Sequence, residues 1–255
     1  MFDMIKLSYM TFVCPDWEIT KVVSFAKAAG YDGVELRVDS DHRHGINSES
    51  PDDVRRRVRC LFEEHGVEVA CIATSGGFAF PELEGLRERV EKAKANLQLA
   101  ADLGAPVVRI FAGGTVPELN DDVADRVAAC FDEVGEFAEP LGICPMLECG
   151  HDIIKGADEA HEVIRRVNTR NFGALWNRSV MDDHTFDILK DRLRHVHVHK
   201  EVLDPQNDNI LHLAGRLKSI NYDGYISLEI IEEKNLPEDV LRETATRLKG
   251  YINRA

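Results

Sequence analysis

The sequence predicts a single (β/α)8 barrel of the α/β class, and three observations carry this prediction. Short apolar or β-branched segments alternate with amphipathic segments along all 255 residues, which is the order strand, then helix. Eight such pairs fit a length typical of this barrel, roughly 250 residues. No proline-rich or serine-rich linker, low-complexity tract or fixed-period repeat divides the sequence. We therefore expect one barrel domain over residues 1–255, in which 44% hydrophobic residues can fill a large core.

An open doubly wound sheet is the alternative for a chain of this length and pattern. That fold is favoured by a glycine-rich phosphate-binding turn after the first strand. The corresponding segment, SYMTFVCPDW at residues 8–17, contains no GxGxxG motif. The barrel is therefore the preferred prediction.

The expected strands are short runs of apolar and β-branched residues. In chain order they are residues 5–10, 33–38, 67–73, 107–111, 144–149, 172–177, 195–200 and 225–230. The expected helices lie between them, and residues 16–30 are typical, with an acidic start and a glycine stop. In chain order the helices are residues 16–30, 50–66, 83–104, 121–142, 156–168, 183–191, 210–221 and 237–252.

The charge balance excludes two classes of partner. The chain has 31 basic and 45 acidic residues, a formal net charge of -14. This charge opposes tight association with a phosphate backbone or an anionic membrane surface. We expect neither nucleic acid nor membrane as a partner.

The cysteines and the first residues indicate the compartment. The six cysteines form no CxxC pair and no framework of the kind that staples small secreted domains. The start, MFDMIKLSYM, lacks a basic segment followed by a long apolar one, and no run approaches 18 apolar residues. We therefore expect reduced thiols in a cytoplasmic protein.

Polar residues end four of the strands expected in the second half, at the face where barrels carry their active sites. They are Glu148, Asn177, the histidines of residues 195–200, and Glu229. Two carboxylates, an imidazole and an amide oxygen from consecutive strands can surround one divalent cation. Such mixed ligands suit Mn2+, Mg2+, Co2+ or Zn2+. A carboxylate that points into a barrel is costly without a partner, which favours function over structure for both glutamates.

The segment HVHVHK places His195, His197 and His199 on one side of an expected strand. Alternate side chains on a strand stand about 6.6 Å apart, whereas imidazole nitrogens bind a metal at roughly 2.1 Å. One ion cannot easily take all three, so the site needs ligands from elsewhere. His195 lies deepest and is interpreted as a hydrogen-bonded core residue.

Four segments together resemble a known family. They are YDGVELR at residues 31–37, LEC at 147–149, HVH at 195–197 or 197–199, and YDGYISLE at 222–229. This pattern resembles the xylose isomerase-like barrel superfamily of sugar phosphate isomerases and epimerases, over essentially the whole chain. The last segment is the most specific of the four.

The resemblance implies a set of metal ligands and acid/base groups. In that family a Glu, an Asp, a His and a second Glu hold a divalent metal, and the two glutamates also move protons. The implied counterparts are Glu148 and Glu229, as ligands and catalytic groups, with His197 ahead of His199 as the histidine ligand. The position of the family aspartate is Asn177, whose neutral oxygen should weaken metal binding.

Other residues remain as alternatives or as substrate contacts. Asp182 or Asp183 can replace the missing carboxylate if the loop that contains them folds back toward the site. The resemblance implies substrate contacts for Glu35 and Arg109 at their strand ends. The remaining expected substrate contacts are His44, in the loop DHRHG at residues 41–45, and the neighbours His199 and Lys200.

The leading hypothesis is a metal-dependent isomerase or epimerase of a small polyhydroxylated carbonyl compound, with or without a phosphate. One glutamate would take a proton from the carbon beside the carbonyl and the other would return it. A dehydratase of the same superfamily is the alternative, since it shares the removal of that proton. A metal-free barrel that binds a small molecule without turnover is a third, and the net charge disfavours a DNA-repair nuclease. Barrels of the resembled type often pair, so a homodimer fits the resemblance.

Overall fold

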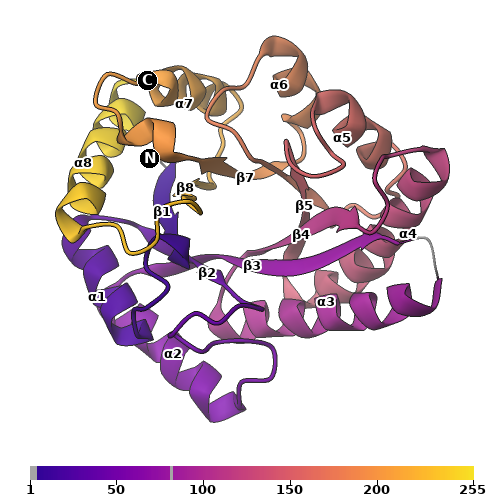
Figure 1. Cartoon of the computed structure of the whole chain (residues 1–255), viewed down its shortest axis with the longest axis horizontal. Coiled ribbons are helices and arrows are strands. Elements are labelled where there is room, and N and C mark those ends of the chain that lie inside the picture. Colours follow the sequence, from indigo (N-terminus) through magenta and orange to yellow (C-terminus); the bar gives the residue numbers. More distant parts are fainter. Residues whose placement is uncertain (1–4, 81–82) are drawn as a thin grey trace.

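The computed structural model describes residues 5–80 and 83–255, and it confirms the predicted fold class. Eight parallel strands form a closed barrel in chain order, and β1 pairs with β8 to close it. Figure 1 shows the helices on the outside of this barrel. The strands are β1 (Lys6–Met10), β2 (Gly33–Arg37), β3 (Glu68–Ala79), β4 (Val107–Gly114), β5 (Cys144–Cys149), β6 (Gly173–Trp176), β7 (Leu193–Val198) and β8 (Tyr225–Leu228).

Eight helices follow the strands at the positions that the sequence predicts. They are α1 (Ile19–Ala29), α2 (Asp52–His65), α3 (Leu83–Leu103), α4 (Asp121–Ala138), α5 (Ala157–Ile164), α6 (Asp183–Leu189), α7 (Asn209–Ser219) and α8 (Glu238–Arg254). The helix expected over 121–142 ends at Ala138 because the chain tightens into a 3-10 turn that contains Pro140. None of the described helices combines the length and apolarity needed to cross a membrane.

The seventh strand differs from its predicted limits. The prediction was 195–200, whereas β7 spans Leu193–Val198 and its pairing with β8 ends at Val198. His199 then serves as the N-terminal cap of a 3-10 helix, Lys200–Leu203, which turns the backbone away from the sheet. The row of three histidines is therefore two strand residues followed by one at the strand end.

β3 and β4 run past the barrel rim, well beyond the predicted ends at residues 73 and 111. Gly77 pairs with Phe111, and Ala79 pairs with Gly114. The two backbones approach so closely that a Cβ added at Gly77 would lie 1.9 Å from the carbonyl oxygen of Gly113. The serine and glycines of this segment have the composition of a turn, which hid the extension in the sequence.

The packing separates two regions of the interior. A large apolar cluster fills the space between the sheet and the helices, and a small one, formed by Cys71, Val107, Met146 and Leu175 with Cys144 against it, lies inside the barrel. The rest of the barrel interior is polar and buried. Its polar side chains include Ser8, Glu35, Arg109, Glu148, His195, His197 and Ser227. Such groups are costly to bury unless they are paired, which directs attention to their partners.

Candidate metal centre

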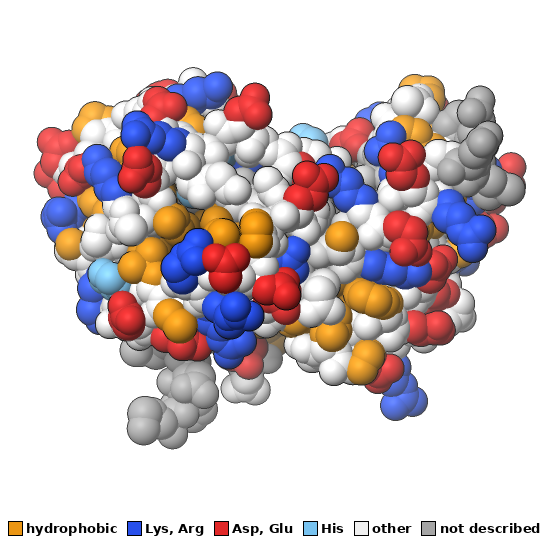
Figure 2. Space-filling view, turned by 90° about the horizontal axis from the view of Figure 1, so that it is seen from below, with side chains coloured by type: hydrophobic (Ala, Val, Ile, Leu, Met, Phe, Trp, Pro, Cys, Tyr) orange, Lys and Arg blue, Asp and Glu red, His pale blue; other side chains and the backbone are white. Residues whose placement is uncertain are grey.

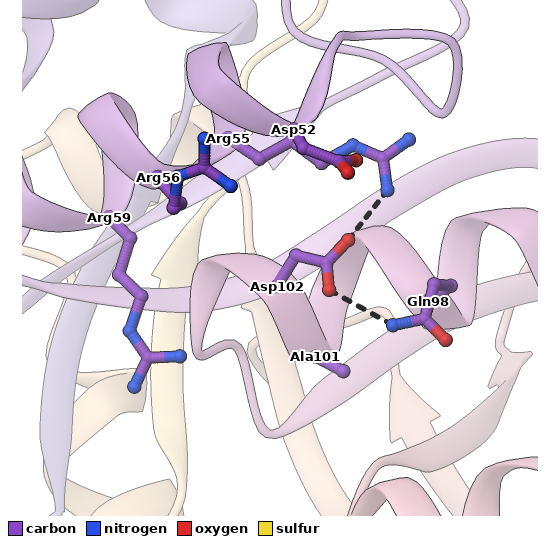
Figure 3. Close-up of a pocket in the computed structure, with 7 residues that line it drawn as sticks. All are labelled: Asp52, Arg55, Arg56, Arg59, Gln98, Ala101 and Asp102. Atoms are coloured by element: carbon purple, nitrogen blue, oxygen red, sulfur yellow. Dashed lines mark hydrogen bonds and ion pairs between the residues drawn. The ribbon is translucent and has the colours of Figure 1, made fainter.

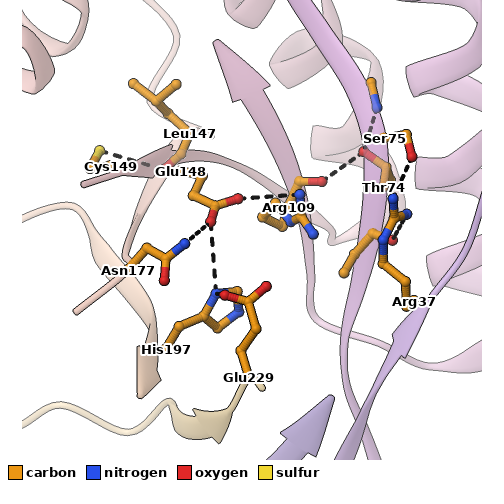
Figure 4. Close-up of polar contacts among 12 residues, drawn as sticks. Arg37, Thr74, Ser75, Arg109, Leu147, Glu148, Cys149, Asn177, His197 and Glu229 are labelled. Carbon is orange, nitrogen blue, oxygen red and sulfur yellow. Dashed lines mark hydrogen bonds and ion pairs between the residues drawn. The ribbon is translucent and has the colours of Figure 1, made fainter. Parts of the chain in front are cut away.

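Four side chains from consecutive strands meet inside the barrel where the strands end (Figure 4). Glu148 belongs to β5, Asn177 follows β6, His197 lies in β7 and Glu229 follows β8. All four are buried, with exposed fractions of 6% for Asn177 and 2% or less for the others. The His197 Nδ1 atom lies 3.2 Å from Glu229 Oε2 and 3.9 Å from Glu148 Oε1. We call these four residues the ligand cluster, and it contains all four predicted ligands.

Strand alternation explains why these side chains point inward. Met146 and Leu175 belong to the small cluster inside the barrel. Glu148 and Asn177 lie two residues further along the same strands, so they face the same side. Extended backbone at the ends of these strands thus aims the four side chains at one point.

Three polar atoms of the ligand cluster lack a hydrogen bond within the described part of the chain. They are Glu148 Oε2, His197 Nδ1 and Glu229 Oε2, and all three are buried. Glu148 Oε2 lies 3.2 Å from Arg109 Nη1, as an ion pair without hydrogen-bond alignment. One oxygen from each glutamate and one nitrogen from His197 also lie within 4.8 Å of one another. Buried imidazole and carboxylate atoms gathered this closely fit a divalent cation with nitrogen and oxygen ligands.

Asn177 lies between Glu148 and His199 and is hydrogen-bonded to both. Its amide nitrogen donates a hydrogen bond to Glu148, and its amide oxygen accepts one from His199. The interpretation of Asp182 or Asp183 as substitute ligands is wrong. Asp182 accepts a hydrogen bond from the backbone of Thr185 and caps α6, and the exposed Asp183 pairs with Arg216 on α7.

Glu35 lies on the far side of the His197 ring from Glu229. Its Oε2 lies 3.0 Å from His195 Nε2 and 3.1 Å from His197 Nε2. His195 is thus a buried, hydrogen-bonded residue. Glu35, His195 and His197 form a second group with metal-ligand spacing. Their facing atoms are joined to one another by hydrogen bonds.

Electrostatics favours anionic carboxylates on both sides of His197. Burial would raise the pKa of Glu229, but His197 and Arg109 lower it to about 2. Burial likewise raises the pKa of Glu35, and His197 and His195 bring it well below the usual value. In turn, Glu35 and Glu229 hold the pKa of His197 above its usual value despite burial. Both carboxylates are therefore in the form that binds a cation.

The expected substrate contacts lie at different depths. Arg109 is 1% exposed and pairs with Glu148. The His199 side chain is 31% exposed, with Nε2 4.0 Å from Glu229 Oε2, so it lies at the open edge of the ligand cluster. The Lys200 side chain is 57% exposed and lies 3.9 Å from Glu232.

The structure does not bring His44 to the ligand cluster. His44 is buried beside Thr11, and its Nδ1 accepts a hydrogen bond from the backbone of Ile46. Sequence reasoning also missed Arg37, which lies two residues beyond Glu35 and points into the barrel near Thr74 and Ser75 (Figure 4). Alternation along GVELR is the signal that pairs Arg37 with Glu35 on one side of the strand.

A groove on the outer surface, lined by α2 and α3, is separate from the ligand cluster. This groove of about 560 Å³ lies between the two helices, with Arg55 paired to Asp102 across it (Figure 3). Its lining includes three arginines and two aspartates, of which Asp102 pairs with Arg55. Figure 2 shows a depression at the upper edge of the molecule, between two raised parts of the surface.

The fold resembles several solved structures, two of which are named as sugar epimerases. One is 3-keto-D-glucoside 4-epimerase from E. coli, at 16% identity and a TM-score of 0.79, covering 96% of this chain and 99% of that one. Another is D-psicose 3-epimerase from Clostridium cellulolyticum H10 with D-tagatose, at 12% identity and a TM-score of 0.78, covering 98% of each chain. A third is the IOLI protein with a bound zinc atom, at 17% identity and a TM-score of 0.77, covering 98% and 99%.

The sequence itself also identifies the family. A comparison with curated proteins gave no match. The model of the xylose isomerase-like TIM barrel family matches residues 23–251. That range includes every strand of the barrel except β1, together with the whole ligand cluster. The chain therefore belongs to the xylose isomerase-like TIM barrel family.

Proposed function

We propose that the protein is a divalent-metal-dependent isomerase or epimerase of a small sugar or related hydroxycarbonyl compound. The observation that carries the proposal is the buried group formed by one nitrogen of His197 and one carboxylate oxygen each of Glu148 and Glu229, which lie within 4.8 Å of one another. The structural neighbours named as sugar epimerases support the same reading. Mn2+, Mg2+, Co2+ and Zn2+ are the candidate ions.

In this proposal Glu148, His197 and Glu229 hold the ion, and Asn177 is the neutral fourth ligand. When bound, the ion polarises the substrate carbonyl and acidifies the neighbouring C–H bond. Glu35 accepts the hydrogen of His197 Nε2, which leaves the Nδ1 lone pair free to bind metal. Glu35 is thus a positioning residue in this account.

The two glutamates supply the proton transfers. One, as the carboxylate, removes the proton from the carbon beside the carbonyl, and the other takes up a proton from solvent and delivers it to the opposite face; the first glutamate then releases its proton to solvent. The net proton count is unchanged, and the product differs in configuration or in carbonyl position. Arg109 fixes the Glu148 carboxylate through their ion pair. His199, at the exposed edge, is placed to contact substrate hydroxyl groups.

The setting of the enzyme follows from the same reasoning. The six cysteines are free thiols, which suits a reducing compartment, and we propose the cytoplasm. A small molecule is the partner that the site requires. A homodimer is the proposed assembly.

Exchange of substrate hydrogen with solvent deuterium tests the proposal. With Mn2+ present, we expect exchange at the carbon beside the carbonyl in a panel of ketoses and keto acids, followed by mass spectrometry. Glu229→Gln keeps the shape but removes the base, so the exchange rate should fall by roughly 10²–10⁴. Glu232→Gln changes an exposed glutamate that pairs with Lys200 and serves as the matched control. Exchange at the unmodified rate in Glu229→Gln would contradict the acid/base assignment.

A further inference from the structure

Two buried arginines lie at one level of the barrel, on either side of β3. The strand register aligns Arg37 of β2 with Ala73 of β3, and Ala73 with Arg109 of β4. Arg37 points inward because Glu35, two residues earlier on the same side, contacts His197. The exposed fractions are 8% for Arg37 and 1% for Arg109. Figure 4 shows Arg109 beside Glu148, and Arg37 further from the ligand cluster, beside Thr74 and Ser75.

Several donors of these two cations are unused. Arg109 Nε and Nη1 have no hydrogen-bond acceptor among residues 5–80 and 83–255, although Nη1 lies near Glu148. Arg37 donates through Nη1 to the carbonyl of Ala73 and through Nη2 to Ser75, but its Nε has no acceptor in the same ranges. A buried guanidinium group with free N–H bonds is costly unless an anion completes it.

One aromatic ring lies near each guanidinium group. The Cζ atom of Arg37 lies 5.5 Å from the centre of the Phe12 ring, and that of Arg109 lies 4.0 Å from the centre of the Phe111 ring. These contacts cover guanidinium faces and supply no acceptor in the plane of the N–H bonds. Planar, edge-on binding is the geometry by which arginine recognises a carboxylate.

The acidic residues two positions before and after Arg37, Glu35 and Asp39, are both already engaged, and Glu35 contacts His195 and His197. Asp39 lies 3.0 Å from Lys92 and accepts a hydrogen bond from Asn96. Burial, and next the charge of Arg109, lower the pKa of Arg37 to about 10. The two cations therefore repel each other, although Arg109 is paired with Glu148 and the carboxylates of Asp39, Glu229 and Glu148 partly offset the shift at Arg37.

The charges around the site indicate what is missing. Three buried carboxylates, those of Glu35, Glu148 and Glu229, face two guanidinium groups, Arg37 and Arg109. With a divalent ion in the ligand cluster and neutral histidines, the balance is one positive charge. A ligand with one negative charge neutralises it, whereas a phosphate group brings roughly 1.5–2 negative charges.

We propose that the substrate is a small hydroxy acid or keto acid whose carboxylate binds between Arg37 and Arg109. In the register, the residue between the two arginines is Ala73, which has a small side chain. A neutral ketose would leave the free N–H bonds unmatched. This inference rests on the proposed function, because the charge of the metal enters the balance.

Binding of glycolate and glycolamide to the Mn2+-loaded protein tests the inference. The two probes have the same size and the same hydroxyl group, and neither has a stereocentre. They differ only in that glycolate carries a carboxylate and glycolamide carries a neutral amide. Titration calorimetry should show glycolate binding at least tenfold more tightly than glycolamide. Inorganic phosphate should bind more weakly than glycolate, and tighter, Arg37-dependent phosphate binding would overturn the assignment to a carboxylate.

Substitutions of the arginines test whether the preference for glycolate over glycolamide comes from the arginines or from the metal. Arg37→Met should reduce the preference to within twofold, whereas Arg37→Lys should keep most of it. Arg109→Lys gives a second, charge-conserving probe of the pair. Arg56→Met, in the outer groove of Figure 3, is the matched control and should leave the preference unchanged. An unchanged preference in a folded Arg37→Met variant would overturn the inference.

Measuring the metal content distinguishes a failure of this inference from a failure of the proposed function. Each variant is assayed for bound Mn2+ and for its unfolding temperature. If Mn2+ is bound and neutral ketoses exchange deuterium while Arg37→Met has no effect on binding, the inference fails and the proposed function stands. If no divalent ion binds, the proposed function fails. In that case, glycolate binding that still depends on Arg37 supports the anion site.

Discussion

Asn177 is the residue that distinguishes this ligand cluster from one with three carboxylates. It donates a hydrogen bond to Glu148 and accepts one from His199, so it links a buried ligand to the exposed edge. A carboxylate at this position could not donate to Glu148. It would face Glu148 as a second negative charge, which only a cation between them would relieve.

Asn177→Asp should therefore tighten metal binding. We expect an increase in Mn2+ affinity of roughly tenfold or more, on the scale that groups around a metal contribute. The metal-free variant should unfold at a lower temperature than the unmodified protein, because of the added repulsion. Competition against a fluorescent chelator measures the affinity. Unchanged affinity would place Asn177 outside the ligand set.

The sequence predicted much of the site at the residue scale. Glu148, His197 and Glu229 were located by strand alternation and by the family pattern, and the structure brings them together. The hydrogen bonds of Glu35 to two histidines of β7 could not be predicted, because they cross the closed barrel. Only the closure of the sheet sets that contact.

At the scale of elements, the extension of β3 and β4 shapes the rim of the barrel. Their pairing beyond residue 73 depends on glycines at the closest approach of the two backbones. The sequence predicted all eight strands but missed this extension, since turn-like composition and strand pairing compete over residues 74–79. Strand limits depend on what lies alongside, which a single sequence does not show.

Gly77→Ala should destabilise the protein by about 1–3 kcal/mol, the usual cost of an overpacked contact. The added Cβ would lie 1.9 Å from the carbonyl oxygen of Gly113. Gly76→Ala is the matched control, because its Cβ would lie 3.6 Å from Thr74 Oγ1, an ordinary contact. Urea unfolding of both variants measures the difference. Equal stability of the two variants would argue against the close approach of β3 and β4.

At the scale of the whole molecule, buried neutral histidines link stability to pH. Burial, with smaller effects from neighbouring charges, lowers the pKa of His42 and of His44 to about 4. As the pH falls, these histidines take up protons near pH 6.5 in the unfolded chain but only near pH 4 in the folded protein. Their contribution is therefore complete above pH 6.5, is lost as the pH falls toward 4, and changes no further below that.

His44→Asn should flatten this dependence. The asparagine oxygen can accept the hydrogen bond that Ile46 now donates to His44 Nδ1, but it does not titrate. Between pH 7 and pH 4.5, the unmodified protein should lose up to about 3 kcal/mol more unfolding free energy than the variant. Urea unfolding at several pH values measures both. Parallel pH curves would show that His44 does not remain neutral in the folded protein.

The fold class and the family could be predicted because they depend on patterns that persist along the entire chain. The order of strands and helices is a local property, and eight repetitions of it favour one closed architecture. The depth of each polar side chain could not be predicted. His44 and Lys200 follow strands on the same face as the ligand cluster, yet one is buried beside Thr11 and the other is exposed to solvent.

The central claim is that Glu148, His197 and Glu229 bind one divalent ion. Anomalous diffraction from crystals grown with Mn2+ tests it most directly. We expect one peak at about 2.0–2.3 Å from His197 Nδ1 and from one oxygen of each glutamate, with the amide oxygen of Asn177 as the fourth ligand. A peak between Glu35, His195 and His197, or no peak at all, would contradict it.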